Sequence, residues 1–387
     1  MKRSTDRILT THAGSLPRPP ALIEAYRSGA SQDVVEQRLR DSVAEVVGRQ
    51  IATGIDVVND GEFGKPMTDA VDYGAWATYV YGRVSGYEFR PVGDDTRVLD
   101  AILGDSKDRI DFASFYDAGG DATSGSQARR VSQMPVNTGE IRYTGQALIE
   151  RDIANFKAAL AAKAPADAFM SSVFTGVQLR DSEFYASGED QAVAIAEAMR
   201  QEYLAITDAG LNLQVDDPII VNVYEMHYSK RGDLAGYRDW ARSHVDLVNH
   251  ALRGIPEDRV RYHLCWGSWH GPHSADLPLA DVIDLLLEIR ASQYSFEAAN
   301  PRHEHEWRVW QNVTLPDGKA LIPGVVTHKT SILEHPELVA DRIVRFAEIV
   351  GRENVVAGTD CGFGGRLDPT LAWAKLGALA EGATSTR

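Results

Sequence analysis

Short apolar runs alternate with longer amphipathic segments along almost the whole chain of 387 residues. The short runs have the composition of buried strands, whereas the longer segments repeat apolar residues with the helical period. The pattern predicts eight strands, near residues 7–12, 55–59, 168–173, 211–215, 260–265, 294–298, 321–327 and 354–359. It predicts helices near residues 32–53, 148–162, 189–209, 234–253, 278–290, 336–350 and 368–379.

Strands that alternate with helices form βα units around a parallel sheet. Eight such units in this length favour a single-domain (β/α)8 TIM barrel, with a doubly wound open sheet as the alternative. Between residues 73 and 145 the apolar periodicity fades, and Gly, Asp, Ser and Arg dominate. We interpret residues 73–145 as an insertion after the second strand, inside one catalytic barrel that spans residues 1–387.

Composition narrows the functional classes. With 44% apolar and 25% charged residues, the chain is typical of a globular protein rather than a disordered one. No apolar run approaches the roughly 18 residues of a membrane span, and the N-terminus lacks the apolar segment of a secretion signal. We therefore expect a cytoplasmic protein with no membrane partner. A net charge of -15 disfavours nucleic acid as a partner, and two cysteines cannot build a disulfide scaffold.

Those two cysteines lie at predicted strand ends, where a barrel of this type builds its active site. His263 and Cys265 are two residues apart on one strand, so their side chains point to the same face. Cys361 follows the last strand, and Glu297 closes the strand between them in order. One imidazole, two thiolates and one carboxylate form a complete tetrahedral set, and the sulfur ligands favour zinc. A cysteine taken singly is more often a small core residue.

The charge of this set indicates the chemistry. Two thiolates and a carboxylate over-neutralise a zinc dication, so bound water would be a poor acid. A thiol bound as thiolate would stay nucleophilic, which favours thiol alkylation over hydrolysis. A structural zinc site is the alternative, although such sites usually use close cysteine pairs, which this chain lacks.

The chain carries an ordered set of motifs: Thr-Thr-x-x-Gly-Ser at residues 10–15, Asp-Gly-Glu at 60–62, Gln-Val-Asp-Asp-Pro at 214–218, His-x-Cys at 263–265 and Asp-Cys-Gly at 360–362. As a set, these motifs resemble the catalytic barrel of cobalamin-independent methionine synthase. The resemblance implies a (β/α)8 barrel with zinc on His263, Cys265, Glu297 and Cys361, thiol-substrate contacts at Ser15, Glu62 and Asp216, and proton transfer at His328. His12 lies on the predicted site face, either as a substrate contact or as a hydrogen-bonded core residue.

Two departures bear on the substrates. Methionine synthase proper has a second, N-terminal barrel, and its pterin-stacking tryptophan after the third strand is replaced here by residues 173–177, Val-Phe-Thr-Gly-Val, which puts methylfolate in doubt. Epoxyalkane:coenzyme M transferase, in which a thiol attacks an epoxide, is similar in size and in the opening Thr-His-x-Gly-Ser-Leu-Pro-Arg at residues 11–18.

We therefore predict a zinc-dependent thiol S-alkyltransferase that acts on a small thiol and an alkyl donor. Thiol addition to an epoxide, a lyase reaction, is the alternative within enzymes, and a non-catalytic structural-zinc barrel is the alternative outside them. A metal-free decarboxylase of the uroporphyrinogen type is disfavoured because it needs no thiolates.

Four further features carry weaker predictions. Asp217 is expected to form a structural ion pair, and His303 and His305 are expected to be solvated. Trp266 and Trp269 are either core residues or walls of a substrate pocket. Residues 362–366 would bind an anion if they open the last helix.

Overall fold

The computed structural model describes residues 1–387 except 67–78, 92–105, 119–132, 175–181, 268 and 387. Eight parallel strands form one sheet in the order β1-β10-β9-β8-β7-β6-β5-β2. The strands are β1 (Leu9–Thr10), β2 (Val57–Val58), β5 (Asp167–Val173), β6 (Asn212–Asp217), β7 (Val260–Leu264), β8 (Gln293–Phe296), β9 (Ala320–Val326) and β10 (Val356–Thr359).

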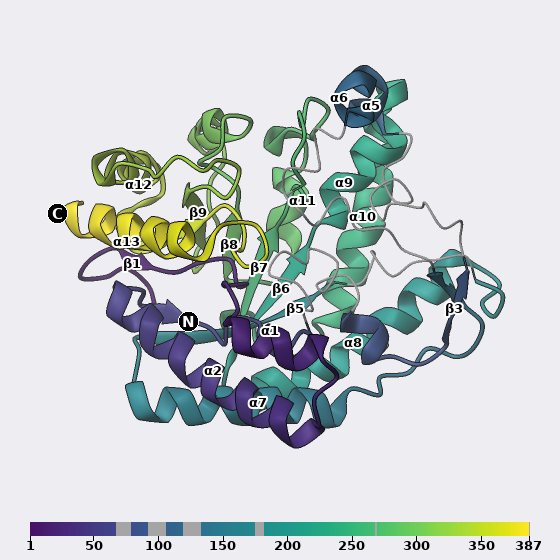
Figure 1. The fold of residues 1–387 in the computed structure, drawn as a ribbon. Helices are drawn as coiled ribbons and strands as arrows, with labels where there is room; N and C mark the ends of the chain where they lie inside the picture. The colour runs from purple at the N-terminus through teal and green to yellow at the C-terminus, as the bar shows by residue number, and fades with distance from the viewer. Residues whose placement is uncertain (67–78, 92–105, 119–132, 175–181, 268, 387) are drawn as a thin grey trace.

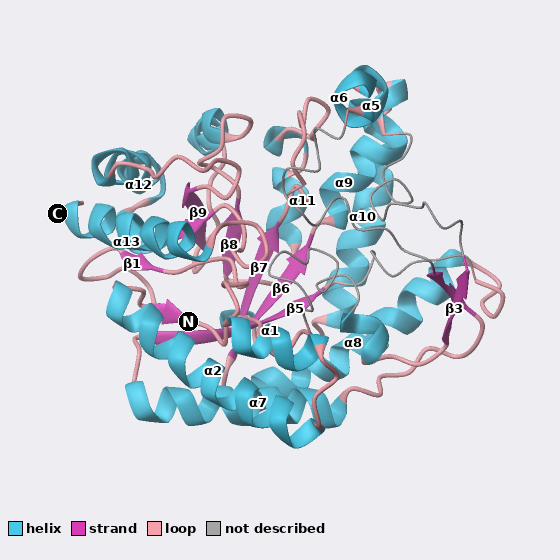
Figure 2. Cartoon of the chain, in the orientation of Figure 1, coloured by secondary structure: helices cyan, strands magenta, loops and turns pink. Residues whose placement is uncertain are grey.

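The two ends of this sheet meet, which makes it a nearly closed barrel. The Asp56 N–H donates to the Thr10 carbonyl at 3.1 Å, and the Thr11 hydroxyl donates to the Val57 carbonyl at 3.0 Å. The strand order follows the sequence around the ring, with helices outside it (Figures 1 and 2). The predicted (β/α)8 barrel is therefore confirmed, and the doubly wound open sheet is wrong.

The main helices outside the barrel match the seven predicted segments, with differences at their ends, and include one, α1, that was not predicted. They are α1 (Pro20–Arg27), α2 (Gln32–Thr53), α7 (Gln146–Lys163), α8 (Gly188–Asp208), α10 (Leu234–Ala251), α11 (Ile283–Glu288), α12 (Pro336–Val350) and α13 (Pro369–Ser385). The helix predicted at 278–290 is shorter, because residues Leu279–Asp281 form a separate 3-10 turn before α11. Helix α13 begins where the Asp368 carboxylate accepts the N–H groups of Thr370 and Leu371.

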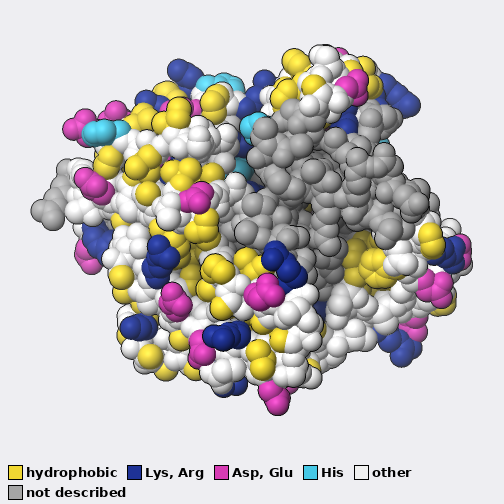
Figure 3. Space-filling model, viewed as in Figure 1, with side chains coloured by type: hydrophobic (Ala, Val, Ile, Leu, Met, Phe, Trp, Pro, Cys, Tyr) yellow, Lys and Arg dark blue, Asp and Glu magenta, His cyan; other side chains and the backbone are white. Residues whose placement is uncertain are grey.

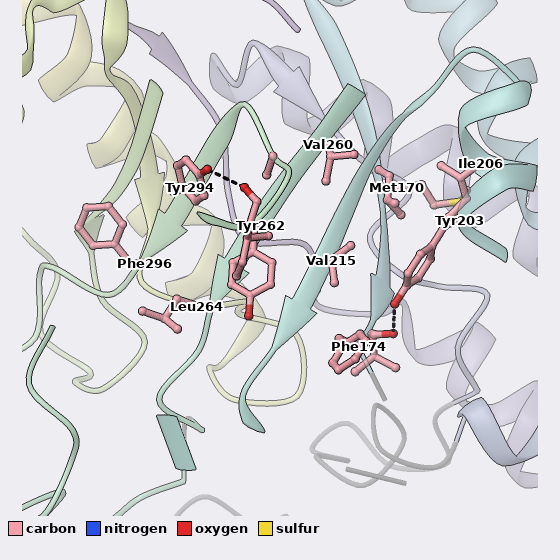
Figure 4. Close-up of a cluster of buried hydrophobic side chains, with 14 of the residues drawn as sticks. Met170, Phe174, Tyr203, Ile206, Val215, Val260, Tyr262, Leu264, Tyr294 and Phe296 are labelled. Atoms are coloured by element: carbon pink, nitrogen blue, oxygen red, sulfur yellow. Dashed lines mark hydrogen bonds between the residues drawn. The ribbon is translucent and has the colours of Figure 1, made fainter. Parts of the chain in front are cut away.

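The strands are buried on both faces, as expected where helices cover a parallel sheet. Aromatic side chains fill the layer between strands and helices, among them Tyr203, Tyr262, Tyr294 and Phe296 (Figure 4). Their hydroxyl groups still find partners, since the Tyr203 hydroxyl donates to the Val173 carbonyl at 2.8 Å. The other face of the strands points into the barrel and carries the polar residues of the site.

Within residues 73–145, the described segments form two separate pieces. Strands β3 (Tyr87–Pro91) and β4 (Gln133–Asn137) pair antiparallel at one side of the barrel, and helices α5 (Lys107–Asp111) and α6 (Ala113–Asp117) lie elsewhere on its periphery (Figure 1). Side chains of both signs are interspersed among the described residues on the face in Figure 3. In the described part of the chain, no helix combines the length and apolarity needed to cross a membrane.

A buried arginine ties the β3–β4 side of the chain to the barrel. Arg83 donates to the Glu202 carboxylate of α8 at 2.9 Å and to the Asp152 carboxylate of α7 at 2.7 Å. The Tyr143 hydroxyl also donates to Glu202, at 2.7 Å. Burial opposes ionisation of Glu202, but the Arg83 charge and these hydrogen bonds hold its pKa below the usual value. One guanidinium therefore links two helices and neutralises Glu202, while Asp152 also pairs with Arg151 at 2.7 Å.

We expect Arg83→Met to lower the free energy of unfolding by about 3–5 kcal/mol, because it leaves the buried Glu202 carboxylate without a countercharge, while Asp152 keeps only Arg151. Chemical denaturation measures the loss. The matched control is Arg90→Met, which removes an arginine paired with Glu183 in solvent and should leave the unfolding free energy unchanged. Equal effects of the two substitutions would contradict the assignment.

Candidate metal centre

Three soft or borderline ligands meet at the carboxyl ends of β7 and β10. The ligand atoms of His263, Cys265 and Cys361 lie within 4.8 Å of one another, and all three residues are buried. The two sulfurs are 3.8 Å apart and form no disulfide. His263 shares a hydrogen bond with the Ser295 hydroxyl through Nδ1 at 3.0 Å, while its Nε2 is buried without a partner. An unpartnered nitrogen beside two thiols that form no disulfide fits a zinc ion.

The pKa values of the two thiols are shifted in opposite directions. Hydrogen bonding between the sulfurs lowers the pKa of Cys361 well below its usual value and raises that of Cys265. The guanidinium of Arg366 favours the thiolate form of Cys361 as well. The Gly267 N–H donates to the Cys265 sulfur at 3.4 Å. This pocket therefore stabilises negative charge on sulfur, as a thiolate metal ligand requires.

Glu297, the fourth predicted ligand, stands outside this group of three. Its Oε2 accepts a hydrogen bond from the Asn300 amide at 2.8 Å, and its Oε1 accepts the Trp266 N–H at 3.3 Å. The side chain is only 1% exposed, and this burial raises the pKa of the carboxyl. The structure thus brings three of the four predicted ligands together and engages the fourth with protein donors.

A cavity opens directly beside the cluster, and the three predicted substrate contacts line it. Its volume, counted to the open mouth, is about 400 Å³. The lining residues are Ala13, Ser15, Glu62, Asp216, Pro218, His263, Cys265, Cys361, Gly362 and Arg366. Residues from five different strand ends therefore face one space, with the two sulfurs on its wall.

The tandem aspartates at the end of β6 point to different surroundings, as expected on a strand. Asp216 faces the cavity, and its Oδ2 has no hydrogen-bond partner. Burial and the Glu62 charge raise the pKa of Asp216 to about 7. Asp217 instead lies 2.5 Å from His244 Nε2 and accepts the Tyr262 hydroxyl at 2.6 Å. The predicted structural pair of Asp217 is confirmed.

Glu62, which lines the cavity, has a left-handed backbone conformation that is rare outside glycine. Its φ of 61° lies in the left-handed region, and the Arg18 guanidinium donates to its carbonyl at 2.6 Å. The carboxylate lies 3.3 Å from Lys65 Nζ, with both side chains buried. It also lies where a side chain of Gly14 would be, since a Cβ at Gly14 would come 2.2 Å from Glu62 Oε1. Glycine at position 14 therefore makes room for the carboxylate.

The two predicted site histidines lie outside the cavity lining. His12 shares a hydrogen bond with Gln50 through Nε2 at 2.8 Å and accepts the Gly14 N–H through Nδ1, and burial lowers its pKa to about 4. This geometry favours the interpretation of His12 as a hydrogen-bonded core residue. His328 is buried with both ring nitrogens unpartnered, and burial lowers its pKa well below the usual value.

The loop after β7 and the segment after β8 interlock behind the cluster. Trp266 and Trp269 are core residues, only 1% and 3% exposed, and neither lines the cavity. The expectation that His303 is solvated is wrong, because its ring is buried between Asp276 at 3.0 Å and Glu306 at 2.9 Å. Although burial disfavours the charged ring, these hydrogen bonds raise the pKa of His303 to about 9.

His305 is exposed, as expected. The three-residue spacing of His303 and Glu306, which places both on one helical turn, was the available signal for the pairing. Residues 362–366 do not open the last helix, because α13 begins at Pro369. Gly362 and Arg366 line the cavity instead. Sequence reasoning missed Lys65 and Asn300, for which neither motif nor spacing gave a signal.

Comparison with known proteins shows which family the sequence of this chain matches. A family model described as the catalytic domain of cobalamin-independent synthase matches residues 152–384. The chain is 25% identical over 380 residues to a 2-hydroxypropyl-CoM lyase of Xanthobacter autotrophicus, covering 92% of this chain and 86% of that protein. It is 24% identical over 391 residues to a methionine synthase of Thermococcus kodakarensis, covering 98% and 93%.

A solved structure shares the fold. The B12-independent methionine synthase from Shewanella sp. W3-18-1 superimposes with a TM-score of 0.70 at 19% identity, and the match covers 98% of this chain and 97% of that one.

We expect Gly14→Ala to lower the free energy of unfolding by about 2–5 kcal/mol, because backbone strain adds to the clash with Glu62. The control is Gly29→Ala, which also has a positive φ but has no other atom within 4 Å of the added Cβ; it should cost only about 1 kcal/mol. Denaturant titration measures both. Combining Gly14→Ala with Glu62→Ala should recover part of the loss, and equal losses in the two glycine variants would refute the contact.

Proposed function

The chain belongs to the family of cobalamin-independent synthase catalytic domains, and on that premise we propose that it is a zinc-dependent S-alkyltransferase acting on a small thiol. One observation carries the proposal. The predicted thiol-binding residues Ser15, Glu62 and Asp216 line the same cavity as the two sulfurs and His263. A structural metal site has no need of an adjoining cavity with a buried, unpartnered carboxylate oxygen.

His263, Cys265 and Cys361 would hold the zinc, with Glu297 as the fourth ligand that the resemblance implies. Bound zinc would lower the pKa of the substrate thiol, so that it reacts as thiolate at neutral pH. The Ser295 hydroxyl on Nδ1 orients the His263 ring and leaves Nε2 toward the cluster.

The cavity residues bind and orient the thiol substrate. Asp216 Oδ2 is a buried oxygen without a hydrogen-bond partner, so it would accept a donor from the substrate, and Glu62 Oε2, paired with Lys65 at 3.3 Å, adds a second acceptor. Arg366 adds a positive charge at the same cavity, suited to an anionic group of the substrate. His328, with both ring nitrogens unpartnered, would take or give a proton near the cluster.

Thiol addition to an epoxide is the second candidate reaction. It is favoured by the similarity to the 2-hydroxypropyl-CoM lyase over 92% of this chain, together with the resemblance of residues 11–18, of which Ala13 and Ser15 line the cavity. The same thiolate would open a ring instead of accepting an alkyl group from a donor. The two reactions differ in the electrophile and share the thiol site.

We expect the purified protein to contain one zinc per chain, with Cys265 and Cys361 protected from thiol reagents until a chelator removes the metal. Because the chain has only two cysteines, the total amount of thiol label reports on this site alone. Metal analysis and timed labelling followed by mass spectrometry provide the measurement. Rapid labelling of both cysteines in the untreated, folded protein would rule out the zinc site.

The transferase proposal is tested by following the zinc shell while a panel of thiols is added. X-ray absorption at the zinc edge should show one more sulfur ligand with the correct thiol, since a thiol-activating ion must accept the substrate sulfur. The panel pairs homocysteine and 2-mercaptoethanesulfonate with methylfolate and short epoxides. We expect slow turnover of homocysteine with methylfolate.

The Glu297→Gln variant sharpens this test. Removing a charged oxygen from an over-neutralised site should weaken zinc binding without abolishing it, while turnover falls by about 10–100-fold. If no thiol enters the zinc shell and Glu297→Gln keeps full activity, the site is structural and the transferase proposal fails.

A further inference from the structure

A buried arginine lies below the metal centre on the inner face of β7. Arg261, His263 and Cys265 alternate along the strand with residues of the outer face, so all three side chains point into the barrel. His263 and Cys265 line the cavity. Arg261 lies two residues before His263, which is about 6–7 Å along the strand. Its side chain belongs to a residue that is only 1% exposed, so a guanidinium is enclosed in the barrel beneath the site.

The hydrogen-bond partners of this guanidinium are neutral. Arg261 Nη1 donates to Thr11 Oγ1 at 3.0 Å, and Nη2 donates to the His12 carbonyl at 2.9 Å. Its Nε has no hydrogen-bond partner. The guanidinium carbon lies 3.9 Å from the centre of the Phe169 ring. Among the described residues, none of the hydrogen-bond partners of Arg261 carries a charge.

A buried charge that contacts only neutral groups is costly to the fold. Burial lowers the pKa of Arg261 to about 9, and the negative charge of Asp216 opposes this shift, so the guanidinium is still charged at neutral pH. A neutral donor could satisfy the same two oxygen atoms at lower cost. The cost therefore indicates that the charge itself has a role besides the two hydrogen bonds.

The peptide between His12 and Ala13 connects the guanidinium with the cavity. Its carbonyl accepts the hydrogen bond from Arg261, and its N–H donates to Thr359 Oγ1 at 3.0 Å. The next carbonyl, that of Ala13, accepts Gln214 Nε2 at 2.8 Å. Ala13 lines the cavity. Side chains from β6, β7 and β10 therefore hold this peptide in place as the floor of the cavity.

Negative groups gather on the other side of this floor. The strand register pairs Arg261 with Gln214 and His263 with Asp216, so Asp216 lies one inward-facing residue above Gln214. Gln214 Nε2 donates to Asp216 Oδ1 at 2.6 Å, whereas Asp216 Oδ2 has no partner and faces the cavity. The two sulfurs lie on the wall of the same cavity. A substrate bound as thiolate would add one more negative charge there.

We propose that Arg261 is a positioning residue of the thiol site, which holds the floor of the cavity and balances from beneath the negative charge of a bound thiolate. This inference rests on the proposed function and assigns a role to a residue outside the predicted site. It predicts a preference for a thiolate over a neutral sulfur in an otherwise identical molecule. A charge at this depth in a protein interior is expected to change thiolate affinity about tenfold.

The test is Arg261→Met in the zinc-loaded, full-length protein, with dissociation constants measured by calorimetry. The probes are homocysteine and 2-mercaptoethanesulfonate, each compared with its S-methyl counterpart, methionine or 2-(methylthio)ethanesulfonate. The dissociation constant of the bound thiol should increase about tenfold, and that of the thioether less than about twofold, because only the thiolate carries the extra charge. Arg261→Lys keeps the charge and should restore thiol affinity to within about threefold of the unaltered protein.

The matched control is Arg259→Met, which removes an exposed arginine that precedes the same strand and donates to the Gly210 carbonyl at 3.3 Å. It should change neither dissociation constant, because solvent screens its charge. Equal weakening of thiol and thioether in Arg261→Met would show that Arg261 only supports the floor, and would overturn the proposal. If Arg261→Met does not fold, Arg261→Gln serves instead, since it keeps an amide donor without the charge. It should show the same selective loss, and an unchanged preference for the thiol would overturn the proposal equally.

Failure of this inference is distinguishable from failure of the proposed function. If the unaltered protein takes no thiol into its zinc shell, both proposals fail together. If thiol enters the zinc shell normally, and the neutral variants of Arg261 keep the full preference for thiol over thioether, only the role of Arg261 is refuted.

Discussion

Closure of the parallel barrel is the constraint on which the site depends. The sheet order runs once around the ring and ends where Asp56 and Thr10 join β2 to β1. Only in a closed ring do the carboxyl ends of β7 and β10 come together, which brings the sulfurs of Cys265 and Cys361 to 3.8 Å. The same closure places Ser15 and Glu62, from the first two strand ends, beside them.

Charged and polar side chains buried in and around the barrel require hydrogen-bond or ion-pair partners. Structural carboxylates obtain them from side chains that act at a distance from the cavity, as Arg83 does for Asp152 and Glu202. His303 does so for Asp276 and Glu306. Several of the exceptions lie at or near the site: Nε2 of His263, Oδ2 of Asp216 and both nitrogens of His328 are buried without hydrogen-bond partners. Unsatisfied buried groups gathered at one place point to bound ligands as their partners.

The loops behind the cluster determine how its members are presented. Trp266 follows Cys265, packs on His303 and donates its N–H to Glu297. Asn300 connects Glu297 with Asp360, which precedes Cys361. Each predicted ligand is therefore held by its own strand and by a neighbour from another strand end, and small changes behind the cluster reach the sulfurs through covalent neighbours.

The sequence by itself determined the architecture and most of the cavity. Strand and helix periods gave the barrel, and the two-residue spacing of His263 and Cys265 set their common direction, because side chains on a strand alternate by rule. The motif resemblance named Ser15, Glu62 and Asp216, and all three line the cavity. Only the tertiary structure decided which hydrogen-bond partner each buried group takes. Glu297 is hydrogen-bonded to Asn300, His12 to Gln50 and His303 to Asp276. The sequence did not indicate these pairs, because the choice among possible partners is made only in the folded chain. The direction of a side chain on a strand is a local property of the backbone, whereas the choice of a hydrogen-bond partner depends on which groups the fold brings within about 3 Å.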